Sequence, residues 1–134
     1  MRNEDLVSLL ESRGVTPTEQ RLEVGRVVLQ RPQHISADEI LAEVNRECSR
    51  VSKATVYNTL KLFVECGLLR EINVDPTRML YDSTTRPHYH FYNVDTGELR
   101  DVEPGSFEIS AMPRLPEGTV EDSVEVVIRV RNRV

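Results

Sequence analysis

Two histidines separated by one residue, His88 and His90, are the side chains of this sequence best suited to bind a metal ion. Side chains alternate along a strand, so both imidazoles lie on one face if this segment is extended. A hairpin whose loop is Thr96-Gly97 places Asp101 opposite Tyr92, and therefore diagonal to His90 on the same face. Two imidazoles and one carboxylate suit Fe²⁺, Mn²⁺ or Zn²⁺.

These residues allow further interpretations at this point. In the same register Glu103 lies directly opposite His90 and competes with Asp101 as the carboxylate ligand. An ordinary hairpin with solvated histidines needs no ion. Metal hydrolases also use His-x-His with carboxylates, but no general base stands apart from the ligands and no substrate cleft is indicated. We therefore predict that the protein is not an enzyme.

A second group of chemically distinctive side chains lies on an expected helix. We expect this helix to begin at Ser52, a favourable N-cap, and to end at Gly67, a favourable C-terminal residue. Its apolar stripe at helical spacing consists of Val56, Leu60, Phe63, Val64 and Leu68. The other face offers hydroxyl, amide, phenol and ammonium groups, which suit a DNA major groove as well as plain solvent. These DNA-binding candidates are Ser52, Lys53, Thr55, Tyr57, Asn58 and Lys61.

Three shorter amphipathic segments precede this helix, and two short strands follow it. Arg21 lies on the second segment, and a capping box from Ser36 to Glu39 begins the third. The expected elements are helices at 5–13, 18–29 and 36–48, with strands at 68–74 and 78–82. A recognition helix followed by a two-strand wing is a winged helix-turn-helix, which we assign to residues 1–83.

The composition changes after residue 83, where a polar linker ends in Pro87. We expect strands at 88–94, 99–103 and 124–130, and one helical turn near 107–112. About 50 residues with three strands make a small core. Residues 84–134 are therefore predicted to be an α/β dimerisation and metal-sensing domain that packs on a second copy, which gives an α+β protein overall.

The composition and net charge of the 134-residue chain limit which partners it can have. No apolar run is long enough to span a membrane. Two separated cysteines, Cys48 and Cys66, form no disulfide framework, which favours the cytoplasm. The net charge is −5, so binding to DNA must depend on locally placed cations and should be sensitive to salt.

Several motifs together resemble the Fur (ferric uptake regulator) family, and the resemblance covers almost the whole chain. They are Thr18-Glu19-Gln20-Arg21, His34 to Ile40, Val51 to Leu60, Gly67-Leu68-Leu69 and His88-Tyr89-His90. The resemblance implies a homodimeric winged-helix repressor that couples a bound metal to recognition of palindromic, A·T-rich double-stranded DNA, with Arg21 on the DNA backbone. It also implies one divalent metal per protomer, held by His34, Asp82, His88, His90 and Asp101.

Two features of this sequence depart from the pattern of the family that it resembles. The family's structural zinc site is held by paired cysteines, and Asn93 and Thr96 stand where the first pair would be. We therefore expect no structural zinc bound by four thiolates. The family's minor-groove lysine is replaced by Thr16, so that contact with DNA is missing.

The missing cysteines and the short C-terminal run resemble the Irr branch of the family, the iron response regulators. This resemblance implies control of iron or haem homeostasis, with haem as a possible ligand in place of a metal ion. A peroxide sensor of the same family and a ligand-independent winged-helix DNA binder also fit these residues.

Overall fold

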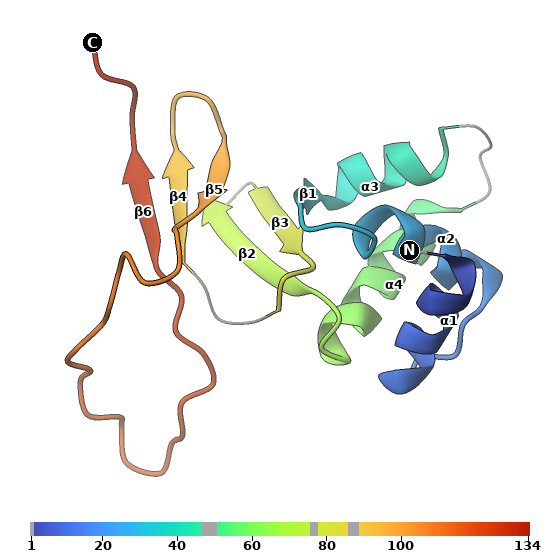
Figure 1. Cartoon of the computed structure of the whole chain (residues 1–134), viewed down its shortest axis with the longest axis horizontal. Coiled ribbons are helices and arrows are strands. Elements are labelled where there is room, and N and C mark those ends of the chain that lie inside the picture. Colours follow the sequence, from blue (N-terminus) through green and yellow to red (C-terminus); the bar gives the residue numbers. More distant parts are fainter. Residues whose placement is uncertain (1, 47–50, 76–77, 86–88) are drawn as a thin grey trace. The chain divides into compact units, whose positions relative to one another are not determined.

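The computed structural model of the chain describes residues 2–46, 51–75, 78–85 and 89–134. It divides into two compact units, Met1–Thr85 and Arg86–Val134. The first unit contains α1 (Asn3–Ser12), α2 (Glu19–Val28), β1 (His34–Ser36), α3 (Ala37–Val44), α4 (Lys53–Glu65), β2 (Arg70–Asp75) and β3 (Arg78–Asp82), as Figure 1 shows. The second contains β4 (His90–Asn93), β5 (Leu99–Asp101) and β6 (Val127–Val130). None of the described helices has the length and apolarity needed to cross a bilayer.

The helices of the first unit begin where short hydroxyl side chains cap them. Thr18 Oγ1 accepts the N–H of Arg21, and Ser52 Oγ accepts the N–H of Thr55. Ser36 and Glu39 form the predicted capping box at the start of α3. The α3 helix ends at Val44, earlier than expected, and the predicted turn before α4 lies partly outside the described residues.

The apolar stripe of α4 is the centre of the helical core. Val56, Leu60 and Phe63 are completely buried, whereas Val64 is only half-buried at the edge. The buried residues that α1, α2 and α3 contribute to this cluster are Leu6, Leu10, Leu22, Val24, Val28, Ala37 and Ile40. At the end of α4, Gly67 has a φ of +77°, and the guanidinium of Arg13 donates to its carbonyl oxygen. These contacts hold the polar face of α4 outward.

The wing is part of a three-stranded sheet in the order β1-β3-β2, whose strands are labelled in Figure 1. We expected a two-strand wing, because residues 30–34 resemble a loop. Instead β1 pairs with β3, and His34 lies directly opposite Asp82. A strand as short as β1 gives no periodic signal in the sequence, so this pairing depends on β3 being present as a template.

The second unit has the strand order β5-β4-β6, with β4 and β5 antiparallel and β4 and β6 parallel. The predicted β4–β5 register is wrong by two residues, because residues 94–97 form the loop rather than Thr96-Gly97 alone. Asn93 Oδ1 accepts the N–H groups of Asp95 and Thr96, and Gly97 closes the turn with a φ of +77°. His90 consequently lies directly opposite Asp101.

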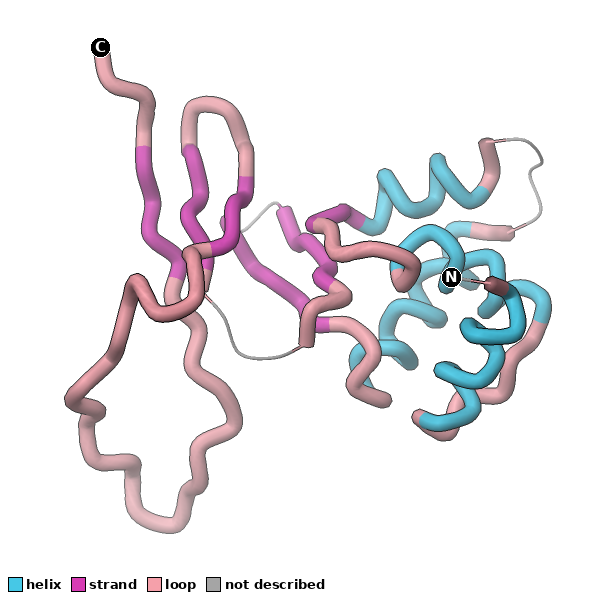
Figure 2. Tube along the Cα trace, in the orientation of Figure 1, coloured by secondary structure: helices cyan, strands magenta, loops and turns pink. Residues whose placement is uncertain are grey.

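The helical turn predicted near residues 107–112 is absent from this described stretch, which belongs to the long loop between β5 and β6 in Figure 2. Most of its side chains are exposed, although the ring of Phe107 packs edge-on against Tyr89 at 5.0 Å between centroids. A single turn without a buried face is unstable, since helices in proteins depend on tertiary packing.

Tyr81 on β3 is a polar member of the helical core, with 7% of its surface exposed. Its burial raises the pKa of the phenol above the ordinary value of 10.0, and Glu71 and Tyr57 raise it further. The folded chain therefore favours the protonated phenol. The resulting stabilisation is fully present below a pH of about 10 and disappears as the pH rises through the higher pKa of the folded state.

We expect Tyr81→Phe to reduce the alkaline sensitivity of folding. The unfolding free energy of the wild-type chain should fall relative to that of the variant as the pH rises above about 10. Urea unfolding followed by circular dichroism over that range measures the difference. Two curves that stay parallel through the alkaline range would mean that the phenol does not titrate differently in the folded state.

Candidate metal centre and nucleic-acid interface

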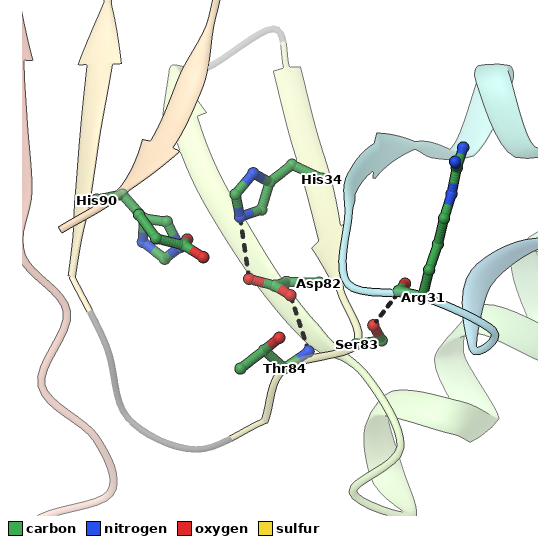
Figure 3. A network of polar contacts seen from close by, with 7 residues as sticks. Arg31, His34, Asp82, Ser83, Thr84 and His90 are labelled. Carbon is green, nitrogen blue, oxygen red and sulfur yellow. Dashed lines mark hydrogen bonds and ion pairs between the residues drawn. The ribbon is translucent and has the colours of Figure 1, made fainter. Parts of the chain in front are cut away.

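An imidazole–carboxylate pair lies at the β1–β3 edge of the first unit. His34 Nε2 is 3.1 Å from Asp82 Oδ2, and Figure 3 shows the ring pointing at the carboxylate. The side chain of Asp82 is only 1% exposed, and that of His34 is 16% exposed. Strand pairing brings the two together although they are far apart in the sequence, since they are partners in the ladder.

The segment that follows Asp82 fixes the orientation of its carboxylate. Asp82 Oδ1 accepts the N–H of Thr84 at 2.8 Å, so both oxygens are engaged on different sides (Figure 3). Ser83 Oγ donates to the carbonyl oxygen of Arg31 at 3.1 Å, which ties the end of β3 to the loop before β1. A side chain held in this way loses little conformational entropy when it binds a ligand.

The second unit contains a similar pair. His90 Nε2 lies 3.2 Å from Asp101 Oδ1, and the imidazole is buried whereas the carboxylate is half-exposed. The predicted diagonal arrangement, with Asp101 opposite Tyr92, is wrong, because Tyr92 pairs with Leu99. Glu103 does not lie opposite His90 either and is exposed. The geometry therefore favours Asp101 over Glu103 as the carboxylate beside His90.

The donor set is chemically suited to a first-row divalent metal. His34, Asp82, His90 and Asp101 are the candidate metal ligands among the residues that the structure describes. Imidazole nitrogens with carboxylate oxygens suit Mn²⁺, Fe²⁺ and Zn²⁺. His88, the fifth predicted ligand, lies outside the described residues.

The exposed face of α4 is the candidate nucleic-acid interface. Ser52, Lys53, Tyr57, Asn58 and Lys61 are exposed, and Thr55 is half-buried. The helix presents this face because the opposite side is filled by the apolar stripe. Ammonium groups suit phosphates, while amide and phenol groups can reach base edges.

Arg21 on α2 lies beside this face. A hollow of about 480 Å³ is lined by Thr18, Gln20, Arg21, Thr55, Asn58, Thr59 and Leu62, so it joins the start of α2 to the middle of α4. Arg21 Nη1 donates to the carbonyl oxygen of Thr16 at 3.0 Å, which directs the guanidinium toward the helix start. Thr18 and Gln20 were not predicted to belong to this surface, although both stand in the motif that contains Arg21.

A winged-helix unit with a polar recognition face, followed by a small sheet with a histidine–carboxylate pair, defines a DNA-binding protein with candidate metal ligands. Residues 12–118 match the Ferric uptake regulator family, and the chain belongs to that family. A peroxide-responsive repressor PerR from Staphylococcus aureus is 29% identical over 100 residues, covering 75% of this chain and 68% of the relative.

Solved structures of the family have the same fold. The ferric uptake regulator of Pseudomonas aeruginosa with manganese has a TM-score of 0.72 at 22% identity, covering 95% of this chain and 97% of that one. The Campylobacter jejuni peroxide stress regulator has a TM-score of 0.62 at 25% identity, covering 98% and 96%. The structure of the Francisella tularensis regulator with iron has a TM-score of 0.69 at 20% identity, covering 90% and 93%.

These findings confirm the α+β fold and the family membership predicted from the sequence. Fur-family proteins are metal-responsive, dimeric, DNA-binding transcriptional regulators rather than enzymes. The assignment to the Irr branch, and with it haem as a ligand, stays a prediction.

Proposed function

We propose that this protein is a homodimeric transcriptional repressor that responds to Fe²⁺ or Mn²⁺, with Zn²⁺ as an alternative, and controls iron homeostasis from the cytoplasm. The observation that carries the proposal is the His34–Asp82 pair, which lies in the same unit as the recognition helix α4. A ligand that engages this pair acts on the DNA-binding unit itself.

Among the described residues, each unit alone supplies too few ligands for such an ion. Zinc in proteins takes four ligands, and ions of the Mn²⁺ type take about six. The described residues contribute one imidazole and one carboxylate from each unit. We therefore propose that a single ion takes ligands from both pairs and from His88, and that residues 84–134 act as the metal-sensing and dimerisation domain.

The chain offers a short route from the metal ligands to the recognition helix. His34 is the first residue of β1, which leads without a loop into α3, and α3 packs against α4 in the helical core. When bound, the ion would supply a positive charge and directed bonds to imidazole and carboxylate. Coupling to DNA requires that it bind the DNA-competent arrangement more tightly, and a coupling of about 1–3 kcal/mol would be typical.

Substitutions of the proposed ligands can separate the binding of the metal from its effect on DNA affinity. We expect His88→Ala and His90→Ala to abolish tight Mn²⁺ binding in isothermal titration calorimetry. His34→Ala should retain weak Mn²⁺ binding but lose the effect of the metal on DNA affinity. The affinity of the wild type should fall as the pH is lowered, since metal binding must displace protons from the imidazoles.

A matched pair of variants controls this experiment. Asp101→Ala should weaken Mn²⁺ binding, whereas Glu103→Ala, a nearby carboxylate on the same segment, should not. Should His34→Ala bind DNA with an unchanged dependence on Mn²⁺, the proposed single ion does not act through the DNA-binding unit. Unchanged DNA binding by the wild type with and without metal would instead favour a ligand-independent winged-helix protein.

We propose that the DNA partner is an A·T-rich palindrome whose half-sites are read by α4 of each protomer. Asn58 can make a bidentate pair with adenine, and the ring of Tyr57 can contact a thymine methyl group. We assign Lys53, Lys61 and Arg21 to phosphates, and Ser52 and Thr55 to backbone or base contacts, because they lie on or beside the exposed face of α4. The distance between the two α4 helices of the dimer would set the half-site spacing.

The roles of two neighbouring exposed residues on α4 can be distinguished. Asn58→Ala should lower discrimination against changes of one base pair by about 1–3 kcal/mol. Lys61→Ala should weaken binding to every duplex by a similar factor and reduce the salt dependence. Fluorescence anisotropy with an operator and its single-base variants measures both. Identical effects of the two substitutions on all duplexes would refute this division of roles.

Hydrogen bonds stand at the positions where the family's first cysteine pair would bind a structural zinc. Asn93 Oδ1 accepts the N–H of Thr96 at 3.1 Å, and Asn93 Nδ2 donates to Asn132 Oδ1 at 2.8 Å. Asp95 Oδ2 accepts the N–H of Asn132, so the hairpin loop and the C-terminal segment are joined without thiolates.

We therefore expect the dimer to survive metal removal. Sedimentation velocity with excess EDTA should show the same dimer as without it, because β6 and its apolar neighbours hold the second unit. Asn93→Ala should lower the thermal midpoint of unfolding in the presence and absence of EDTA alike. Dissociation of the wild type on chelation would contradict this account.

A peroxide-responsive repressor is the second candidate, favoured by the similarity to PerR. DNA binding of the Fe²⁺-loaded protein measured before and after addition of hydrogen peroxide distinguishes it from an iron-uptake regulator. Titration with haem, followed by absorbance, tests the haem-responsive function that the resemblance to the Irr branch implies.

A further inference from the structure

The ring of Tyr57 is held at two points on the DNA-facing side of the first unit. Its hydroxyl donates to Asp38 Oδ1 on α3 at 3.3 Å. The ammonium of Lys53, one turn earlier on α4, lies 5.7 Å from the centroid of the ring. A tyrosine side chain has only two flexible torsions, so a contact on the hydroxyl and another on the face define its orientation.

The contact between Tyr57 and Asp38 contributes little to the stability of the fold. The two oxygens are 3.3 Å apart, longer than the usual 2.7–2.8 Å, and both residues are exposed. A solvated bond of this kind adds little to the free energy of folding. A carboxylate on the face that meets DNA also repels phosphates, so its presence there weakens binding to every sequence.

We propose that Asp38 is a positioning residue that sets the specificity of Tyr57 for DNA, an inference that rests on the proposed role of α4. With its hydroxyl engaged by Asp38, Tyr57 presents ring carbons rather than a free O–H to the major groove. An apolar ring edge suits the methyl group of thymine and leaves base acceptors unmatched. Asp38 thus lowers general affinity and raises selectivity between base pairs.

The test uses the full chain with saturating Mn²⁺ and a duplex that the wild type selects from a randomised library. Selectivity is the ratio of the affinity for that duplex to the affinity for single-base variants, measured by fluorescence anisotropy. Asp38→Ala should lower this ratio about two- to tenfold, because the freed hydroxyl of Tyr57 can then meet base acceptors, whereas Tyr57→Phe, which has no hydroxyl, should preserve it. Asp38→Ala in the Tyr57→Phe background should leave the ratio unchanged, because no hydroxyl remains for Asp38 to engage.

Two substitutions separate the hydrogen bond from the charge. Asp38→Asn should keep the selectivity ratio, because the amide oxygen can accept the same hydrogen bond. It should raise affinity for all duplexes about two- to fivefold at low salt, because one negative charge is lost. Glu65→Gln is the control, since it removes an exposed charge from α4 about 12 Å along the helix axis from Tyr57 and should leave the ratio unchanged.

Failure of this inference can be told apart from failure of the proposed function. If Tyr57→Ala abolishes selectivity but Asp38→Ala preserves it, Tyr57 reads DNA without Asp38 and the inference is wrong while α4 remains the reading element. If no duplex is selected, the proposed role of α4 is wrong and the inference is overturned with it. If Tyr57→Ala changes nothing while Asn58→Ala still lowers selectivity, α4 reads DNA without Tyr57 and only the inference is wrong. Thermal unfolding of each variant verifies that α3 still forms.

Discussion

The carboxylate of Asp82 is almost completely buried, and a buried charge is costly unless several partners compensate it. The imidazole of His34 and the backbone N–H of Thr84 supply two such partners from opposite directions. The β1–β3 end of the first unit is arranged around this requirement. The β1–β3 ladder brings His34 to the carboxylate, and the Ser83–Arg31 contact holds the following segment in place. A metal ion is a natural further partner for such a pair, because its charge is opposite to that of the carboxylate.

The position of α4 depends on a different constraint, the close packing of its apolar stripe. Val56, Leu60 and Phe63 are fully buried, so α4 cannot rotate without exposing them. Its outward residues are therefore presented at fixed angles, and only their side-chain torsions remain free. The contacts of Asp38 and Lys53 with Tyr57 restrict one of these side chains further. Core packing thus orients the helix, and polar contacts on its surface orient a single ring.

The acidic net charge is consistent with selective rather than general binding to DNA. A protein with a net charge of −5 is not attracted to DNA by its overall charge. In the proposed interface, binding comes from a few cations on α2 and α4 together with base contacts, which favours selective over general association. In the second unit, Asn93 accepts a hydrogen bond from Thr96 and donates one to Asn132, at the positions where the resemblance predicted no thiolates.

Much of the fold could be predicted because its signals are local. The N-caps Ser36 and Ser52, the apolar periodicity of α4 and the left-handed Gly67 act within one or two turns of the chain. The alternation of side chains along a strand likewise predicted that His90 and Asp101 share a face of the sheet. A shift of the register by two residues keeps both side chains on that face. The exact register was missed, because it depends on the side chain of Asn93 capping the turn.

The tertiary structure alone decided which distant residues meet. β1 is a strand because β3 offers it a ladder, and this places His34 beside Asp82. Asp38 reaches Tyr57 because the packing of α3 on α4 brings their polar edges together. The sequence by itself determined which chemical groups are available and on which face of each element they lie, through the periods of helix and strand. Which of those groups act on one another depends on packing between elements, which no local period encodes.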